Sequence, residues 1–238
     1  MRENKFKQIY SQLASDIQRG EIQPNSFLPS EHELVEQFQT SRETIRKALK
    51  LLSEHGYIQK MQGKGSLVLD VKRMDFPVSG LVSFKELAIK MGKETITYVE
   101  HFSETVPSKE IVGQLKLKED ELIWEIVRVR EIDGERIIVD KDFINKTFIP
   151  SLTKSICEQS IYEYIENDLG LTISFAKKEF TVEEPTDEDQ RYLDLKGHCN
   201  VVVVKNYVYL EDASLFQFTE SRHRPDKFRF VDFARRSH

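Results

Sequence analysis

The stretch from Thr40 to Glu54 constrains the chain more than any other segment, and it reads Thr-Ser-Arg-Glu-Thr-Ile-Arg-Lys-Ala-Leu-Lys-Leu-Leu-Ser-Glu. When successive residues are placed about 100° apart, the apolar ones share one stripe, namely Ile45, Ala48, Leu49 and Leu52. The basic ones lie on the adjacent arc, namely Arg42, Arg46, Lys47 and Lys50. The pattern predicts an amphipathic helix that packs one face on a core and presents one basic edge.

The sequence also predicts where this helix begins and how its basic residues are spaced. Thr40 and Glu43 have capping-box spacing, in which the hydroxyl accepts an N–H of the first turn and the glutamate returns to the cap. Arg42, Arg46 and Lys50 step by four, so they repel one another unless a negative partner lies alongside. A DNA duplex would supply that charge, and a solvated helix face is the alternative.

Charge is unevenly distributed along the chain. The net charge of -5 over 238 residues is unusual for a nucleic-acid binder. Residues 1–70, however, hold 10 basic and 9 acidic residues, and residues 42–64 hold 6 basic and 2 acidic ones. Affinity for DNA depends on the phosphates neutralised at the footprint, so a local basic patch suffices for site-limited contact.

The length of the chain predicts two domains.

The cysteines and the apolar segments limit the classes of protein to which this chain can belong. Cys157 and Cys199 lie far apart without metal-ligand spacing, which predicts two buried thiols in a reducing cytosol and no metal site. No N-terminal apolar segment of the signal-peptide type is present, and no apolar run approaches about 18 residues. These features predict a cytoplasmic protein, and nothing in the sequence calls for a cofactor.

Two more helices are predicted before the basic one. The first rests on apolar residues at helical spacing, namely Phe6, Ile9, Tyr10, Leu13 and Ile17. Ser30 and Glu33 form a second capping box, which predicts a helix over Glu31–Phe38. Only Gln39–Ser41 separates it from the basic helix, so the pair predicts a helix-turn-helix whose second member lies in the major groove.

A hairpin is predicted directly after the basic helix. Tyr57–Lys60 and Ser66–Leu69 have strand character and flank the loop Met61–Gly65. The two glycines of this loop allow close approach to another backbone, and Lys64 lies between them. The hairpin is therefore interpreted as a wing.

The motifs from Leu28 to Gly65 resemble the winged-helix domain of GntR-family bacterial transcription repressors. The family pattern runs L-P-S-E-x-E-L, S-R-x-T-[IV]-R-x-A-L, G-[YW] and a G-x-G wing, and the chain meets it without gaps. The resemblance implies that nine residues contact DNA, namely Ser30, His32, Ser41, Arg42, Thr44, Arg46, Gln62, Gly63 and Lys64. Arg46 is the best candidate for a bidentate guanine contact. His32 replaces the family's usual arginine, which weakens the case for a charged contact there.

The remainder of the chain alternates between strand and helix patterns. The expected strands are Thr95–Phe102, Leu122–Ile132, Arg136–Phe143, Asn200–Leu210 and Leu215–Arg222, and the expected helices cover Pro107–Leu115, Ile161–Leu169 and a segment opening at Thr186. Antiparallel strands with helices between them indicate an α+β fold. This part resembles the UTRA effector domain, whose fold is similar to chorismate lyase. The sequence thus predicts a winged helix-turn-helix domain at 1–70, a linker at 71–78 and a UTRA domain at 79–238.

One predicted strand carries two arginines where burial is expected. Arg128 and Arg130 share a face with Trp124 and Ile126, and the opposite face is apolar, so the strand is expected to be buried on both sides. Two buried guanidinium groups are costly unless they are paired. A bound phosphate would match their geometry. The alternative is a structural pairing with Asp140 or Glu125, and the register that would place Asp140 on the arginine face is not fixed by the sequence.

Two further features fit a sugar site less specifically. Ser160 and Glu163 have capping-box spacing, so Ser160 marks a helix start with free N–H groups and Tyr162 lies in the first turn. A plain helix cap is the commoner explanation for such a pair. Another set shares one strand face, namely Phe216, Phe218, Glu220 and Arg222. It fits a sugar site with an aromatic floor or a core edge with a surface ion pair equally well.

Longer stretches resemble those GntR-family repressors that respond to trehalose 6-phosphate, namely Met74–Leu87, Ser160–Ile165, Phe216–Arg224 and Phe233–Arg236. The resemblance implies effector contacts at Ser83, Phe84, Arg128, Arg130, Ser160 and Tyr162, to which the strand patterns add Asp140, Glu220 and Arg222. It further implies a homodimeric repressor of a trehalose-utilisation operon that binds a palindromic operator and is released by this effector. One alternative is another effector, such as glucosamine 6-phosphate. The other is a lyase-like enzyme, for which no paired nucleophile and base, metal spacing or carboxylate pair is evident.

Two substitutions separate base reading from phosphate contact. Arg46→Ala is expected to cost about 1 to 3 kcal/mol of operator binding and to relax the preference at one base pair. Lys64→Ala is expected to weaken binding to all sequences and to reduce the salt dependence by about one counterion. Operator titrations at several salt concentrations, with single-base variants of the site, measure both effects. Equal losses on every sequence for Arg46→Ala would contradict its assignment as a base reader.

Overall fold

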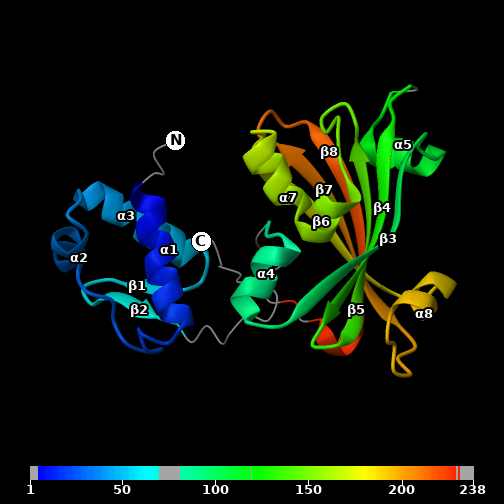
Figure 1. Cartoon of the computed structure of the whole chain (residues 1–238). Coiled ribbons are helices and arrows are strands. Elements are labelled where there is room, and N and C mark those ends of the chain that lie inside the picture. The colour runs from blue at the N-terminus through cyan, green and yellow to red at the C-terminus, as the bar shows by residue number, and fades with distance from the viewer. Residues whose placement is uncertain (1–4, 70–80, 119, 229, 231–238) are drawn as a thin grey trace. The chain divides into compact units, whose positions relative to one another are not determined.

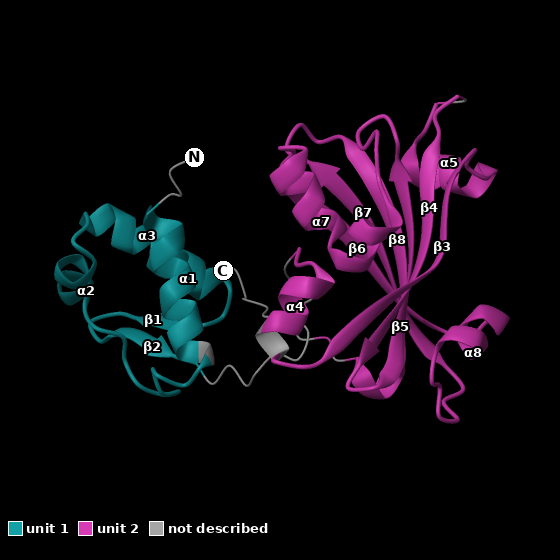
Figure 2. Ribbon diagram, in the orientation of Figure 1, with its two compact units in different colours: residues 1–75, 231–238 teal, residues 76–230 magenta. Residues whose placement is uncertain are grey.

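The computed structural model describes residues 5–69, 81–118, 120–228 and 230, and these divide into two compact units with the boundary after residue 75 (Figures 1 and 2). The linker predicted at 71–78 lies outside the described residues. Within the described part of the chain, no helix is long and apolar enough to cross a membrane.

The first unit has three helices and a two-stranded hairpin. Its elements are α1 (Lys5–Gln18), α2 (Glu31–Phe38), α3 (Arg42–Glu54), β1 (Ile58–Met61) and β2 (Gly65–Val68). The apolar stripe of α3 is fully buried, since Ile45, Leu49 and Leu52 are at most 2% exposed. It packs against the apolar face of α1 in one core. The predicted winged helix-turn-helix is therefore formed, with β1 and β2 as the antiparallel wing.

The start of α3 differs from the prediction by one residue. The N-cap is Ser41, whose hydroxyl accepts the Thr44 N–H at 3.2 Å, so the capping box predicted for Thr40 and Glu43 is wrong. Thr40 instead closes the preceding helix, because its N–H donates to the Val35 carbonyl at 3.2 Å after Gln39 turns into the left-handed region (φ 46°). The other capping box, Ser30 with Glu33 at the start of α2, is confirmed.

The second unit is built on a six-stranded antiparallel sheet with the strand order β3-β4-β5-β8-β7-β6. The strands are β3 (Thr95–Thr105), β4 (Ile123–Ile132), β5 (Glu135–Asn145), β6 (Ile173–Glu183), β7 (Val201–Leu210) and β8 (Leu215–His223). Asp133 and Gly134 join β4 to β5 with φ values of 51° and 78°, as a tight hairpin turn requires. The edge strand β6 was not predicted, because its exposure follows no strict alternation.

Helices cover both faces of this sheet. Helices α4 (Phe84–Met91) and α7 (Ile161–Glu163), the latter continued by a π-helical turn (Tyr164–Asp168), lie on one side, and α5 (Lys109–Leu115) and α8 (Asp187–Tyr192) lie on the other (Figure 1). A short helix α6 (Lys154–Gln159) precedes α7. The α+β class is confirmed, whereas α4 and α6 were not predicted.

The α8 side of the sheet holds a buried ion-pair network around Arg222. This arginine is 3% exposed, and its Nε lies 2.8 Å from Asp189 on α8. Its Nη1 lies 3.0 Å from both Glu183 and Glu220. The network ties α8 and the edge strand β6 to the central strand β8. Glu220 and Arg222 are therefore structural partners of each other.

Asp189→Ala tests how much this network contributes to the stability of the fold. Asp189 is 1% exposed, so its loss leaves a buried guanidinium short of its nearest carboxylate. The free energy of unfolding is expected to fall by about 3 kcal/mol, measured by urea denaturation of the full chain. Asp187→Ala, at an exposed position in the first turn of the same helix, serves as control. Equal stability of the two variants would contradict the interpretation.

Candidate functional site

The nine residues predicted to contact DNA lie at three places in the first unit. These are the start of α2 (Ser30, His32), the start of α3 (Ser41, Arg42, Thr44, Arg46) and the turn of the wing (Gln62, Gly63, Lys64). All are exposed except Thr44, which is half-buried and lies with its hydroxyl 2.9 Å from that of Ser41. The two serines cap their helices, so their hydroxyls already have backbone partners.

The basic edge of α3 is partly neutralised within the chain. Arg46 donates from Nε to Glu31 of α2 at 2.9 Å, and Lys50 lies 3.6 Å from Glu54. The repulsion expected along this edge is thus relieved by acidic side chains before any duplex is bound. Because Glu31 takes only Nε, no described residue bonds the terminal nitrogens of Arg46, which keep the geometry for a bidentate base contact. Arg42 forms no ion pair with any described residue.

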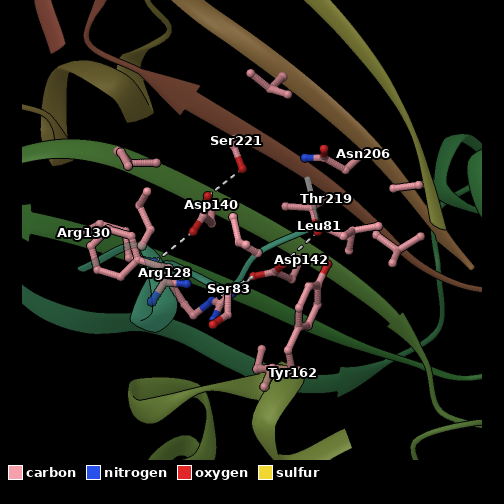
Figure 3. Close-up of a pocket in the computed structure, with 18 of the residues that line it drawn as sticks. Leu81, Ser83, Arg128, Arg130, Asp140, Asp142, Tyr162, Asn206, Thr219 and Ser221 are labelled. Atoms are coloured by element: carbon pink, nitrogen blue, oxygen red, sulfur yellow. Dashed lines mark hydrogen bonds and ion pairs between the residues drawn. The ribbon is translucent and has the colours of Figure 1, made fainter. Parts of the chain in front are cut away.

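The second unit contains a cavity on the face of the sheet that carries α4 and α7 (Figure 3). Seven of the nine predicted effector residues line it, namely Ser83, Phe84, Arg128, Arg130, Asp140, Ser160 and Tyr162. Glu220 and Arg222 do not line it, because they lie on the opposite face of β8 in the α8 network. Their assignment to the effector site is corrected on this ground. Their neighbours Thr219 and Ser221, one residue out of phase, face the cavity instead.

The cavity floor consists of residues in register across five strands. One row runs from Arg128 on β4 through Asp140 on β5, Ser221 on β8 and Val204 on β7 to Phe180 on β6. The next row continues the same face with Asp142, Thr219, Asn206 and Lys178. The β4–β5 register therefore places Asp140 on the arginine face, the point that the sequence left open.

Both buried arginines are paired with carboxylates. Arg130 donates from Nε to Asp140 at 2.9 Å, as the structural alternative predicted. Arg128 binds Asp142 through Nε at 2.8 Å and Nη2 at 2.6 Å, a partner that the sequence analysis missed. Glu125 partners neither of them. The period-two spacing of Asp140 and Asp142 on one strand was the signal that could have identified the pair.

The ion pairs with the carboxylates leave part of each guanidinium group free to bind a ligand. Arg130 uses Nη1 for the Thr97 hydroxyl at 2.8 Å, and Arg128 uses only Nε and Nη2. Nη1 of Arg128 and Nη2 of Arg130 have no hydrogen-bond partner among the described residues, and both arginines line the cavity. Two guanidinium arms are thus left over, which suits an anion with several acceptor oxygens.

The carboxylates are fixed from the neighbouring strand. Asp140 accepts the Ser221 hydroxyl at 2.6 Å, and Asp142 accepts Gln217 Nε2 and the Thr219 hydroxyl at 2.8 Å each. These contacts form one polar ladder across three strands, which consists of Arg128 and Arg130 on β4, Asp140 and Asp142 on β5, and Gln217, Thr219 and Ser221 on β8. Because each carboxylate is held by side chains of β8, the arginines keep their orientation without a ligand.

Burial and charge set the ionisation of the cavity. Burial, followed by the charge of Arg128, lowers the pKa of Arg130 to about 10, so it remains a cation at neutral pH. Burial alone would raise the pKa of Asp140, but the charges of Arg130 and Arg128 outweigh it and the pKa is lowered. Burial lowers the pKa of His223, at the end of β8, to about 4, so it is neutral at pH 7. An added anion would therefore meet a desolvated cation pair.

Two helix starts converge on the same cavity. Ser83 caps α4 in a capping box with Glu86, and Ser160 caps α7 by accepting the Glu163 N–H at 3.3 Å. The predicted capping box at Ser160 is only half formed, since the Glu163 carboxylate pairs with Lys85 of α4. This ion pair connects the two helix starts, whose N–H groups and positive dipole ends favour anions.

Several cavity residues were not identified from the sequence. They are Asp142, Lys178, Asn206, Thr219, Ser221 and His223. Lys178 lies on β6, the strand that was not predicted, and the β8 residues were missed because the opposite face of that strand was chosen. Of the two cysteines predicted to be buried thiols, Cys157 is buried, whereas Cys199 is exposed, so that prediction is wrong for Cys199. Among the described residues, no group of His, Cys, Asp and Glu side chains is arranged to hold a metal ion.

Comparison with known proteins agrees with both units. The model of the bacterial regulatory proteins of the gntR family matches residues 5–68, and the model of the UTRA domain matches residues 90–229. The HTH-type transcriptional regulator TreR of Bacillus subtilis is 59% identical over 99% of this chain and 99% of its own length. The HTH-type transcriptional repressor NagR of the same species is 30% identical over 97% of this chain and 95% of its own length.

Two solved structures extend the agreement to the fold. The possible transcriptional regulator YydK of Bacillus subtilis superposes with a TM-score of 0.81 at 26% identity and covers 97% of this chain and 99% of that one. The effector-binding domain of the Bacillus subtilis trehalose repressor TreR covers 60% of this chain and 99% of that one, with 58% identity and a TM-score of 0.56. These relatives are transcriptional regulators and not enzymes. The chain therefore belongs to the GntR family of DNA-binding transcriptional regulators, in the branch that carries a UTRA effector domain.

Proposed function

We propose that this regulator is a homodimeric repressor of trehalose-utilisation genes, released from its operator when trehalose 6-phosphate enters the cavity of the second unit. The observation that carries the proposal is the pair of unused guanidinium arms on Arg128 and Arg130, beside the starts of α4 and α7. Guanidinium groups and helix N-termini both favour phosphate. The relative TreR of Bacillus subtilis, a trehalose repressor, supports the choice of sugar.

A phosphorylated ligand fits this site better than a neutral sugar. The cavity holds two buried arginines against two carboxylates that are already engaged with them, and Lys85 and Lys178 also line it. A phosphate would accept from the unused arms without displacing either carboxylate. A neutral disaccharide would leave those arms desolvated and unpaired, at a cost in binding free energy.

Two-fold symmetry follows from the proposed target. A palindromic operator presents two equivalent half-sites about one helical turn apart, so two winged helices of a homodimer would each read one. Ligand binding would favour a dimer arrangement in which the two wings no longer match this spacing. Coupling of about 1 to 3 kcal/mol would loosen operator binding roughly 5- to 150-fold.

The switch is proposed to begin at the start of α4. Sequence reasoning placed it in Val71–Pro77 and Ser79–Phe84, of which only residues 81–84 are described. Ser83 and Phe84 line the cavity, and the Phe84 ring lies 4.7 Å from the Arg130 guanidinium carbon. A phosphate at the arginines would therefore contact the segment that continues directly into the chain between the two units.

A sugar phosphate panel tests the effector. Trehalose 6-phosphate at 100 times its Kd is expected to raise the free energy of unfolding by about 2.7 kcal/mol, seen as a thermal shift, and to reduce operator binding. Glucosamine 6-phosphate, the effector of the rival proposal, and unphosphorylated trehalose are run beside it. Operator binding that is indifferent to every sugar phosphate would refute the proposal.

Arg128→Lys tests the anion site itself. A lysine keeps a positive charge beside Asp142 but removes the second guanidinium arm, so affinity for the effector is expected to fall at least about tenfold. Operator binding without effector is expected to remain unchanged. Arg191→Lys, at an exposed position on α8, is the matched control. A wild-type thermal shift in Arg128→Lys would place the phosphate elsewhere.

A further inference from the structure

The far end of the cavity floor presents an amide with no protein partner. Asn206 on β7 lines the cavity and stands in register between Thr219 on β8 and Lys178 on β6. Within the described ranges, its side chain makes no hydrogen bond, whereas the neighbouring Thr219 hydroxyl is committed to Asp142 at 2.8 Å. Figure 3 shows Asn206 on the opposite side of the cavity from Arg128 and Arg130.

The next row of the same face is closed by a buried amide. Gln217, in register with Val208 of β7 and 2% exposed, donates its Nε2 to Asp142 and does not line the cavity. Its Oε1 has no hydrogen-bond partner among the described residues, but burial keeps it out of reach of a ligand. The amide that a polyhydroxylated ligand can reach at this end of the floor is therefore that of Asn206.

The distance across the sheet separates this end from the anion site. Arg128 lies on β4 and Asn206 on β7, three strand spacings apart in the order β4-β5-β8-β7, or about 14 Å. A sugar phosphate anchored at the arginines would place its first ring over Asp140 and Ser221 of the intervening strands. Only a ligand with a second ring would extend to Asn206.

We propose that Asn206 is a specificity-determining residue that hydrogen-bonds the unphosphorylated ring of a disaccharide phosphate, so that the cavity distinguishes disaccharide from monosaccharide phosphates. The amide offers a donor and an acceptor, which matches the mixed character of vicinal sugar hydroxyls. This inference rests on the proposed function, since it requires a sugar phosphate at the arginines. It adds a requirement on the length of the ligand, which must carry a phosphate at one end and a pair of hydroxyl groups at the other.

Asn206→Leu tests the proposal because it removes the amide and keeps similar size. Isothermal titration of the full chain with trehalose 6-phosphate is expected to give a Kd about tenfold weaker than wild type. The Kd for glucose 6-phosphate, which has the phosphate and one ring, is expected to change less than about twofold. Asn206→Ser, with a shorter polar side chain, repeats the test if the leucine variant is poorly folded, and operator binding without effector verifies the fold.

The control and the outcomes separate this inference from the proposed function. Asn200→Ala, at an exposed position outside the cavity, is expected to match wild type for both ligands. Wild-type affinity of Asn206→Leu for trehalose 6-phosphate, or equal losses for both ligands, would overturn the assignment of Asn206. A wild-type protein that binds neither ligand would instead refute the proposed function. If glucose 6-phosphate binds too weakly to measure, the trehalose 6-phosphate result decides alone.

Discussion

The polar ladder across β4, β5 and β8 is the interaction on which the second unit depends. Two arginines are accommodated in a sheet interior because each meets a carboxylate on the adjacent strand, and each carboxylate meets hydroxyl or amide groups one strand further. Such pairs do not by themselves stabilise a fold over an apolar core. Their value lies in orientation, since they hold two guanidinium groups in one place and leave an arm of each unused. The polar groups of the cavity are therefore held in place without a ligand.

The two faces of this sheet differ, because one lines the cavity and the other carries the Arg222 ion-pair network. On β8, alternate residues serve the cavity and the Arg222 network, so neighbours in the chain have unrelated roles. The α8 network fixes the edge strand β6, which in turn supplies Lys178 and Phe180 to the cavity floor. A loss of stability on one face would thus affect the geometry of the other.

Sequence reasoning reached the architecture of both units and seven of the residues that line the cavity, and its errors have physical causes. Amphipathic periodicity located α1 and α3, the Ser30–Glu33 capping box located α2, and the Asp133-Gly134 turn located the β4–β5 hairpin. The cap of α3 was misplaced because Thr40 and Ser41 are both competent caps, and the closure of α2 decides between them. Strand β6 was missed because an edge strand need not alternate. Glu220 and Arg222 were assigned to the wrong site because period two identifies a shared face but not which face meets the ligand.

The Arg46–Glu31 pair has a consequence for the search along DNA. An arginine that is already bonded to its own chain gains less from a random phosphate than a free one, because the internal contact has to be given up or shared. If Arg46 contacts a base as expected, its terminal nitrogens are the ones available for that contact, and Glu31 would compete with DNA phosphates for Nε.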